Sequence, residues 1–196
     1  MADPSPRTDR REQILQAFAA MLETHPGSRI TTAALARHVG VSEAALYRHF
    51  PSKAKMIDGL IAFAEAAIFD RIGQIIVEHR DPEPRCGAVL TLLLAFCERN
   101  PGFARLFAGD ALQGETDRLR QRMRQFYDRI ETQLRQIIRE AYATRPTSPP
   151  LSTAGAANLL LASAEGRISQ FVRSEFKVQP TEGWTTQWQV LARALF

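Results

Sequence analysis

The stretch Val41–Lys53, VSEAALYRHFPSK, brings together side chains that can meet phosphates and base edges. A serine precedes two adjacent alanines, and an aromatic and several cationic side chains crowd the far end. A helix that enters a DNA major groove, about 12 Å wide, must be thin where it enters, so small residues suit its start. The stretch therefore predicts a short recognition helix that presents its N-terminal end to DNA.

The candidate DNA contacts surround this predicted helix. Ser42, Glu43 and Ala44 form its tip, where helix amides can also meet a phosphate. Tyr47 offers a hydroxyl and a flat apolar face, which suit a phosphate or a thymine methyl. We expect the remaining candidates to contact the DNA backbone or a neighbouring minor groove; they are Thr31, Thr32, Arg48, His49, Lys53, Arg10 and Arg11.

Other roles are open to several of these residues. Tyr47 can be a core aromatic, and we expect that role for Phe50, which precedes Pro51. Arg48 can be an ordinary solvated charge. His49 has no second His, Cys or carboxylate at ligand spacing, so we expect no metal site, and we expect no cofactor.

Two short predicted helices, residues 32–38 and 42–48, position these side chains. Gly40 between them is the residue type that tolerates the left-handed conformation at a helix C-terminus. Ser42 can then cap the second helix. We expect a small core against Phe18 and Leu22, formed by Leu35, Ala36, Val39, Val41, Ala45 and Leu46. This is a helix-turn-helix.

Apolar residues recur at helical spacing nearly everywhere else, without a sustained strand pattern. We expect an all-α protein of about nine helices, with a three-helix helix-turn-helix head at residues 1–52 and a helical bundle body at 53–196. Thr8 or Asp9 can cap the first helix, which ends before HPGS, residues 25–28. The remaining predicted helices are 52–79, 85–99, 103–109, 113–144, 152–176 and a last one carrying Trp184, Trp188, Leu191 and Leu195.

The predicted helix 113–144 has a heptad-like apolar seam with an arginine-rich opposite face. We interpret this seam as one side of a bundle core rather than as a free-standing coiled coil. The turn formers RPTSPP, residues 145–150, then predict a loop. The seam consists of Leu119, Met123, Phe126, Ile130, Leu134 and Ile137.

Composition and charge restrict the class of protein. The chain has 196 residues, of which 45% are hydrophobic, and no apolar run approaches the ~18 residues that span a bilayer. The polar start has no signal-peptide core, so we expect a cytoplasmic protein without a membrane span. Residues 1–55 hold eight Lys/Arg against five Asp/Glu, a balance of +3, whereas the rest holds seventeen against sixteen. A basic N-terminal end favours a polyanionic partner.

The two cysteines, Cys86 and Cys97, belong to one predicted helix. At 1.5 Å per residue they lie about 16 Å apart along its axis, which is too far for a disulfide. We expect buried, reduced thiols.

The run YRHFPSK, residues 47–53, resembles the TetR family, in which a Tyr-x-x-Phe element closes the recognition helix. This resemblance implies a TetR-like fold for the all-α chain. ERNPG at residues 98–102 and QFVRSEFK at 170–177 resemble the nucleoid occlusion factors, an atypical branch of that family, with Gln170 in place of an arginine. The resemblance implies a nucleoid-associated homodimer on palindromic double-stranded DNA that antagonises assembly of the division protein FtsZ. It also implies a groove for the C-terminal tail of FtsZ, formed by Phe63, Arg71, Leu92, Arg99 and Asn100.

Alternatives remain at this point. A ligand-responsive TetR-type repressor would have the same head with a hollow body. A helical interaction module would bind no DNA. Arg99 and Asn100 can simply cap a helix ahead of Pro101. The apolar bulk that would form a dimer interface can instead fill the core of one chain; it consists of Leu159, Leu160, Leu161, Ile168, Phe171 and Val172.

We expect no enzyme, because the sequence has no Gly-rich phosphate loop, no paired metal motif and no nucleophile with an evident base. The four histidines, His25, His38, His49 and His79, are scattered over different elements.

Overall fold

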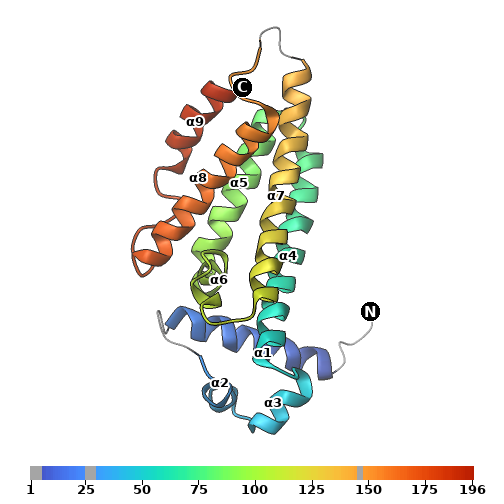
Figure 1. Cartoon of the computed structure of the whole chain (residues 1–196), viewed down its shortest axis with the longest axis vertical. Coiled ribbons are helices and arrows are strands. Elements are labelled where there is room, and N and C mark those ends of the chain that lie inside the picture. The colour runs from blue at the N-terminus through green and yellow to red at the C-terminus, as the bar shows by residue number, and fades with distance from the viewer. Residues whose placement is uncertain (1–5, 25–29, 145–147) are drawn as a thin grey trace.

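The computed structural model describes residues 6–24, 30–144 and 148–196. Over these residues the regular structure is entirely helical, which confirms the all-α prediction (Figure 1). The elements are α1 (Pro6–Thr24), α2 (Thr32–Val39), α3 (Glu43–His49), α4 (Lys53–Glu78), α5 (Pro82–Arg99), α6 (Pro101–Phe107), the 3₁₀ helix η1 (Asp110–Leu112), α7 (Asp117–Ala143), α8 (Thr153–Arg173) and α9 (Trp184–Leu195).

Three helices begin earlier than the sequence patterns predicted. The prediction that Thr8 or Asp9 caps the first helix is wrong, because α1 already begins at Pro6. Likewise α5 begins at Pro82 and α6 at Pro101. Proline is favoured in the first turn of a helix, where its missing N–H costs no hydrogen bond. Pro82 and Pro101 therefore start helices, whereas the sequence patterns predicted starts at residues 85 and 103.

The ends of α7 and α8 also differ from the predictions. The helix predicted from residue 113 begins at Asp117, after η1 and a turn at Gly114 with φ 74°. The helix predicted to residue 176 ends at Arg173, because Glu175 and Phe176 adopt positive φ. The predicted connection at residues 25–28 and the first half of the one at 145–150, residues 145–147, lie outside the described residues.

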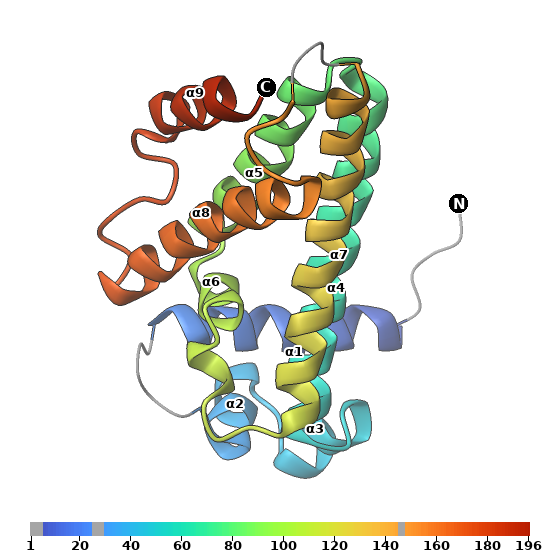
Figure 2. The same ribbon diagram turned by 45° about the horizontal axis from the view of Figure 1, so that its top comes forward.

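The helices divide the molecule into two ends (Figures 1 and 2). The short helices α2 and α3 lie below α1 at one end. The long helices α4 and α7 run side by side from that end through the body, and α5, α8 and α9 complete it. α4 therefore reaches from the exit of α3 to the far end of the body.

One hydrophobic core joins these elements. All six residues of the predicted α7 seam are at most 5% exposed, which confirms that it is one side of the bundle. Aromatic rings extend this core between helices, with the Phe107 and Phe126 ring centroids 4.8 Å apart. The same core includes Phe18, Leu35 and Leu46 of the first three helices. Because one core spans both parts, packing does not separate residues 1–52 from residues 53–196. The division of the chain into a DNA-binding head and a body therefore remains a proposal.

α1 and α6 touch at a glycine. A Cβ added to Gly102 would lie 2.1 Å from the carbonyl oxygen of Ala19, so no other residue allows this approach. Next to it the buried guanidinium of Arg105 donates to the carbonyl of Leu22 at 2.8 Å. The first helix is therefore fixed directly to the body.

Both cysteines are buried and free, as predicted. Burial raises the pKa of Cys86 to about 12 and raises that of Cys97 further. In the described part of the chain, none of the helices has the length and apolar content needed to cross a bilayer.

Candidate nucleic-acid interface

The turn between α2 and α3 is built by its capping residues. The Thr31 hydroxyl accepts from the Ala34 amide at 3.2 Å and starts α2. Gly40 ends α2 with φ 73°, in the left-handed region. The Ser42 hydroxyl accepts from the Ala45 amide at 3.1 Å and starts α3. These local bonds fix the angle between the two helices, and the helix-turn-helix prediction is confirmed.

α3 is anchored by one face and exposed on the other. Leu46 is fully buried and Phe50 is 1% exposed, which confirms Phe50 as a core aromatic. Tyr47 is 43% exposed and is not a core residue. The tip residues Ser42, Glu43 and Ala44, and also Arg48, are exposed as well.

A chain of hydrogen bonds orders the polar surface of this head. The Tyr47 hydroxyl donates to the Thr32 hydroxyl at 3.2 Å, and that hydroxyl donates to a Glu43 carboxylate oxygen at 2.9 Å. Thr32 of α2 and the exposed side of α3 therefore share one face. An approaching phosphate can accept from both hydroxyls if the Glu43 carboxylate turns away.

The predicted cationic contacts lie around the same helix and are partly engaged within the chain. Arg11 donates to the carbonyl of His49 at 2.6 Å, and its guanidinium lies 4.3 Å from the centroid of the Phe50 ring. Arg10 donates to Gln13 at 2.8 Å.

Lys53 is more constrained than these arginines. Its ammonium pairs with the Glu115 carboxylate at 2.7 Å, and the two side chains are 21% and 9% exposed. Lys53 therefore has to leave a body residue to reach a phosphate. His49 is half-buried, and the described residues contain no group of three His, Cys, Asp or Glu side chains that could hold a metal ion.

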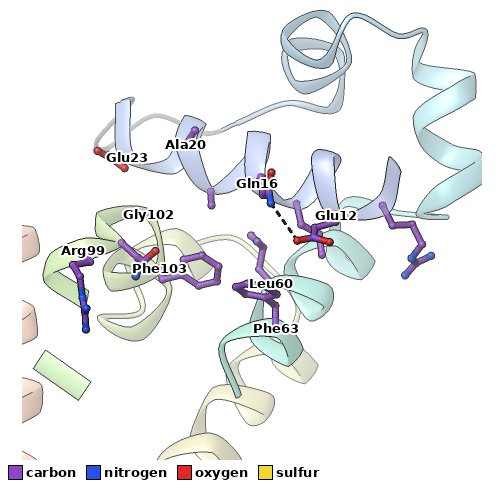
Figure 3. Close-up of a pocket in the computed structure, with 13 residues that line it drawn as sticks. Glu12, Gln16, Ala20, Glu23, Leu60, Phe63, Arg99, Gly102 and Phe103 are labelled. Carbon is purple, nitrogen blue, oxygen red and sulfur yellow. Dashed lines mark hydrogen bonds between the residues drawn. The ribbon is translucent and has the colours of Figure 1, made fainter. Parts of the chain in front are cut away.

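A second feature of the molecule is a cavity of about 600 Å³ between α1, α4 and the α5–α6 corner (Figure 3). Its apolar wall is formed by Leu15, Leu60, Phe63 and Phe103. Charged side chains flank this wall: Glu12 and Glu23 come from α1 and Arg99 from α5, and Arg11 completes the set. The cavity can hold an apolar anchor together with charged neighbours of either sign.

The cavity includes three of the five candidate groove residues. Phe63, 47% exposed, lines it with Arg99 and Asn100. The exposed Arg71 and the half-buried Leu92 are not among its lining residues. Arg71 instead donates to Glu78 at 2.7 Å, and this contact raises the pKa of Arg71.

Arg99 and Asn100 also make the contacts expected of helix-capping residues. The Arg99 side chain donates to the Ala95 carbonyl at 3.1 Å, and the Asn100 amide donates to the Phe96 carbonyl at 2.7 Å. Both contacts satisfy carbonyls in the last turn of α5. The capping alternative is therefore present in the structure, and any peptide role for these residues remains a proposal.

The contribution of α1 to the cavity was missed by the sequence analysis. Leu15, Ala19 and Ala20 form this side of it. The available signal was Gly102 directly after Pro101, because a glycine in the first turn of a helix permits close approach by another backbone.

Comparison with known proteins agrees with both parts of the molecule. Residues 14–60 match the family model "Bacterial regulatory proteins, tetR family". Residues 81–196 match an SlmA-like model described as "Tetracyclin repressor-like, C-terminal domain". The chain is 58% identical over 189 residues to the nucleoid occlusion factor SlmA of Marinomonas sp. (strain MWYL1), with 96% of each chain covered.

The chain belongs to the TetR family and, within it, to the SlmA nucleoid occlusion factors. The SlmA of Shewanella woodyi (strain ATCC 51908 / MS32) is also 58% identical, over 191 residues and 97% of each chain. The TetR family consists of DNA-binding regulatory proteins, and the name nucleoid occlusion factor indicates a role in cell division.

The similar solved structures have low sequence identity to this chain, so they support its fold and not its function. FadR from Bacillus subtilis, in complex with stearoyl-CoA, superposes with a TM-score of 0.80 at 14% identity and covers 94% of this chain and 99% of its own. A TetR regulator from Haloarcula marismortui superposes with a TM-score of 0.77 at 20% identity, over 96% and 98%. The TetR-like prediction is therefore confirmed across the whole body.

Proposed function

We propose that this SlmA-family chain acts as a homodimer that binds palindromic chromosomal DNA and, when so bound, antagonises FtsZ polymer assembly. The observation that carries the proposal is the exposed, small-sided tip of α3, held by caps at Thr31, Gly40 and Ser42 on a chain of this family. Division would then be blocked over the nucleoid, and the protein would be cytoplasmic and nucleoid-associated.

DNA binding follows from the geometry of the head. Ala44 leaves the entering end of α3 slim, while Tyr47, Thr31 and Thr32 supply hydroxyls beside it. The predicted backbone contacts from Arg10, Arg11, Arg48, His49 and Lys53 would fix its register.

The dimer is needed because one short helix makes few base contacts. Two heads about one helical turn apart read a palindrome and add their contacts. Most of the apolar residues first considered for the interface lie in the core of one chain, since Leu160, Leu161, Ile168 and Phe171 are at most 3% exposed. α8 nevertheless presents Leu159, which is 40% exposed, beside exposed Ala154, Ala162 and Gly166. Small residues along this face let a second α8 approach closely.

We assign the FtsZ tail to the cavity beside Phe63. An apolar anchor of the tail would rest on Phe63, and Arg99 would pair with a tail carboxylate. Asn100 would contribute hydrogen bonds, while Arg71 and Leu92 would contact the tail beyond the cavity. DNA and tail thus occupy different surfaces joined by α1 and α4.

A ligand-responsive repressor is less well supported by the body of this chain. Leu90, Leu94 and Cys97 of α5 are 0% exposed, so no void that admits water touches them. The apolar run of α5 therefore fills the bundle at these positions. Release of the protein from its operator by a small effector, without any effect on FtsZ, would support the repressor instead.

The decisive experiment is sedimentation of FtsZ polymers with this protein and specific DNA, scrambled DNA or no DNA. We expect loss of polymer with specific DNA and little loss in the other two mixtures. Equal polymer in all three would refute the division role while leaving DNA binding to be measured separately.

Charge reversal tests the tail groove. Arg99→Glu and Arg71→Glu should each abolish binding of an FtsZ C-terminal peptide and leave binding to DNA unchanged. If both variants still bind the peptide, the groove lies elsewhere. Sedimentation equilibrium at micromolar concentration tests the dimer, and a monomer there would contradict it.

A further inference from the structure

A second hollow, of about 440 Å³, lies at the side of the head. It is lined by residues of α1, the α3–α4 corner, α4 and the start of α7. We propose that this hollow binds a DNA backbone phosphate beside the recognition helix, so that the body helix α7 adds a contact to the DNA interface. This inference rests on the proposed DNA binding and extends it to Arg118 and Arg122, which the sequence analysis did not include.

The hollow has an excess of positive charge. Lys55, Arg118 and Arg122 all approach the single carboxylate of Asp58, with nitrogen–oxygen distances of 3.3, 3.9 and 3.7 Å. Arg11 also lines it. Arg122 is also paired with Glu65, but Lys55, Arg118 and Arg11 still exceed the one negative charge of Asp58, so the hollow favours an anion.

The two arginines differ in how free they are. Arg122 forms a forked pair with the buried carboxylate of Glu65, so it supports the wall of the hollow. The side chain of Arg118 is 74% exposed, and its contact with Asp58 is long. Arg118 is therefore the side chain that can turn to a phosphate without disrupting packing.

The position of these arginines in α7 is an independent argument. Four arginines fall within the first eight residues of the helix, against one aspartate. Cations at a helix N-terminus are disfavoured by the helix dipole, which favours anions there. A phosphate at this end would interact favourably with the dipole and with the arginines together. Arg118 and Arg122, one turn apart, share the face toward this hollow, whereas Arg120 and Arg124 line another one.

The hollow adjoins the predicted DNA surface. Phe50 and Pro51, which directly follow α3, form part of its wall, and Arg11 reaches from it to the carbonyl of His49. Figure 2 shows the N-terminal end of α7 beside α4, and residues of the α3–α4 corner and of the start of α7 line the hollow together. The face of the Phe50 ring is covered by Arg11, so the aromatic ring of this wall is not open to a peptide anchor. A cationic wall without an open aromatic ring suits a phosphodiester.

The test compares Arg118→Ala with Arg139→Ala, which makes the same charge change at an exposed position near the other end of α7. Binding to an operator duplex and to a scrambled duplex is measured from about 50 to 200 mM salt. At roughly 0.9 per phosphate contact, a dimer of Arg118→Ala should lose about 1.8 from its log–log salt slope. Its affinity deficit against wild type should shrink about tenfold across that range, on both duplexes. Arg139→Ala should retain the wild-type slope.

Three results would overturn the proposal. If wild type binds with a steep slope and both variants match it, the α7 contact does not exist and the proposed DNA binding still stands. If wild type shows no salt-dependent binding to either duplex, DNA binding and the α7 contact fail together. If Arg118→Ala keeps its slope but loses affinity for an acidic FtsZ-tail peptide, the hollow serves a peptide.

Discussion

The contact between α1 and α6 gives the sharpest test of how the head is held on the body. Replacing Gly102 with alanine would place a Cβ 2.1 Å from the Ala19 carbonyl oxygen and 2.9 Å from its carbon. Real Cβ contacts essentially never fall under 3.0 Å, so the helices must separate by about 1 Å or deform. Both atoms on the α1 side belong to the backbone, and no side chain can rotate away.

We expect Gly102→Ala to lower the free energy of unfolding by about 1–3 kcal/mol, the usual cost of overpacking. For a chain of this length that is a fall in Tm of about 2–12 °C, measured by calorimetry or circular dichroism. The matched control is Gly73→Ala in α4, where a Cβ meets nothing within 4 Å. A helix-interior Gly→Ala change stabilises by about 1 kcal/mol, so this variant should gain about 2–4 °C.

The two variants should thus move Tm in opposite directions. A rise in Tm for Gly102→Ala comparable to that of Gly73→Ala would show that α1 does not rest on α6 as described. A fall for both would mean that helix propensity does not control the response at Gly73.

Three further predictions concern single side chains. Glu115→Gln should tighten DNA binding by about 1 kcal/mol per head, roughly fivefold for one head and thirtyfold for a dimer in titrations, because Lys53 no longer leaves a carboxylate; weaker binding would mean that Glu115 positions Lys53 for DNA. Because burial raises the pKa of Cys86 to about 12, its alkylation at about pH 8 should be slow in native protein and fast in urea, and equal rates would contradict its burial. Burial and the nearby Glu131 raise the pKa of Glu165, so the folded protein holds this proton more tightly than the unfolded chain, and the free energy of unfolding should fall as pH rises above the ordinary carboxyl pKa. Glu165→Gln removes this cost, so it should raise Tm most near pH 8 and leave it unchanged near pH 4. A difference in Tm that does not depend on pH would contradict this.

The sequence predicted the helix-turn-helix well because its determinants are local. Thr31, Gly40 and Ser42 act on amides and carbonyls within a few residues, and these types have strong positional preferences. The buried stripe of α7 was equally readable from its spacing. The helix starts at Pro82 and Pro101 were missed because proline both ends one helix and begins the next.

The candidate site was less predictable because it depends on contacts between distant segments. Lys53 was expected to be free for phosphate, yet it pairs with Glu115, 62 residues away. The resemblance pointed to α4 and α5 for the groove, but not to the wall that α1 contributes through Leu15. No local pattern specifies such contacts, since they follow from how helices pack.

The same contacts supply a physical route between the two proposed binding surfaces. The cavity has one wall from α1, which belongs to the DNA-reading head, and one from α4 and α6, where Phe63 and Phe103 lie. A DNA contact that draws Lys53 from Glu115 or shifts α1 against Gly102 would change the width of this cavity. DNA can then alter tail affinity only if the tail binds the two cavity widths unequally.

Thermodynamic reciprocity makes that requirement measurable. If operator DNA tightens binding of an FtsZ-tail peptide by some factor, the peptide must tighten DNA binding by the same factor. We expect equal factors in the two titrations, and we expect them to shrink together in Gly102→Ala, because an added Cβ at this position shifts α1 against α6 in the wall that the two surfaces share. Peptide affinity that is identical with and without DNA would show that the cavity does not sense the head, whatever the affinity of each surface alone.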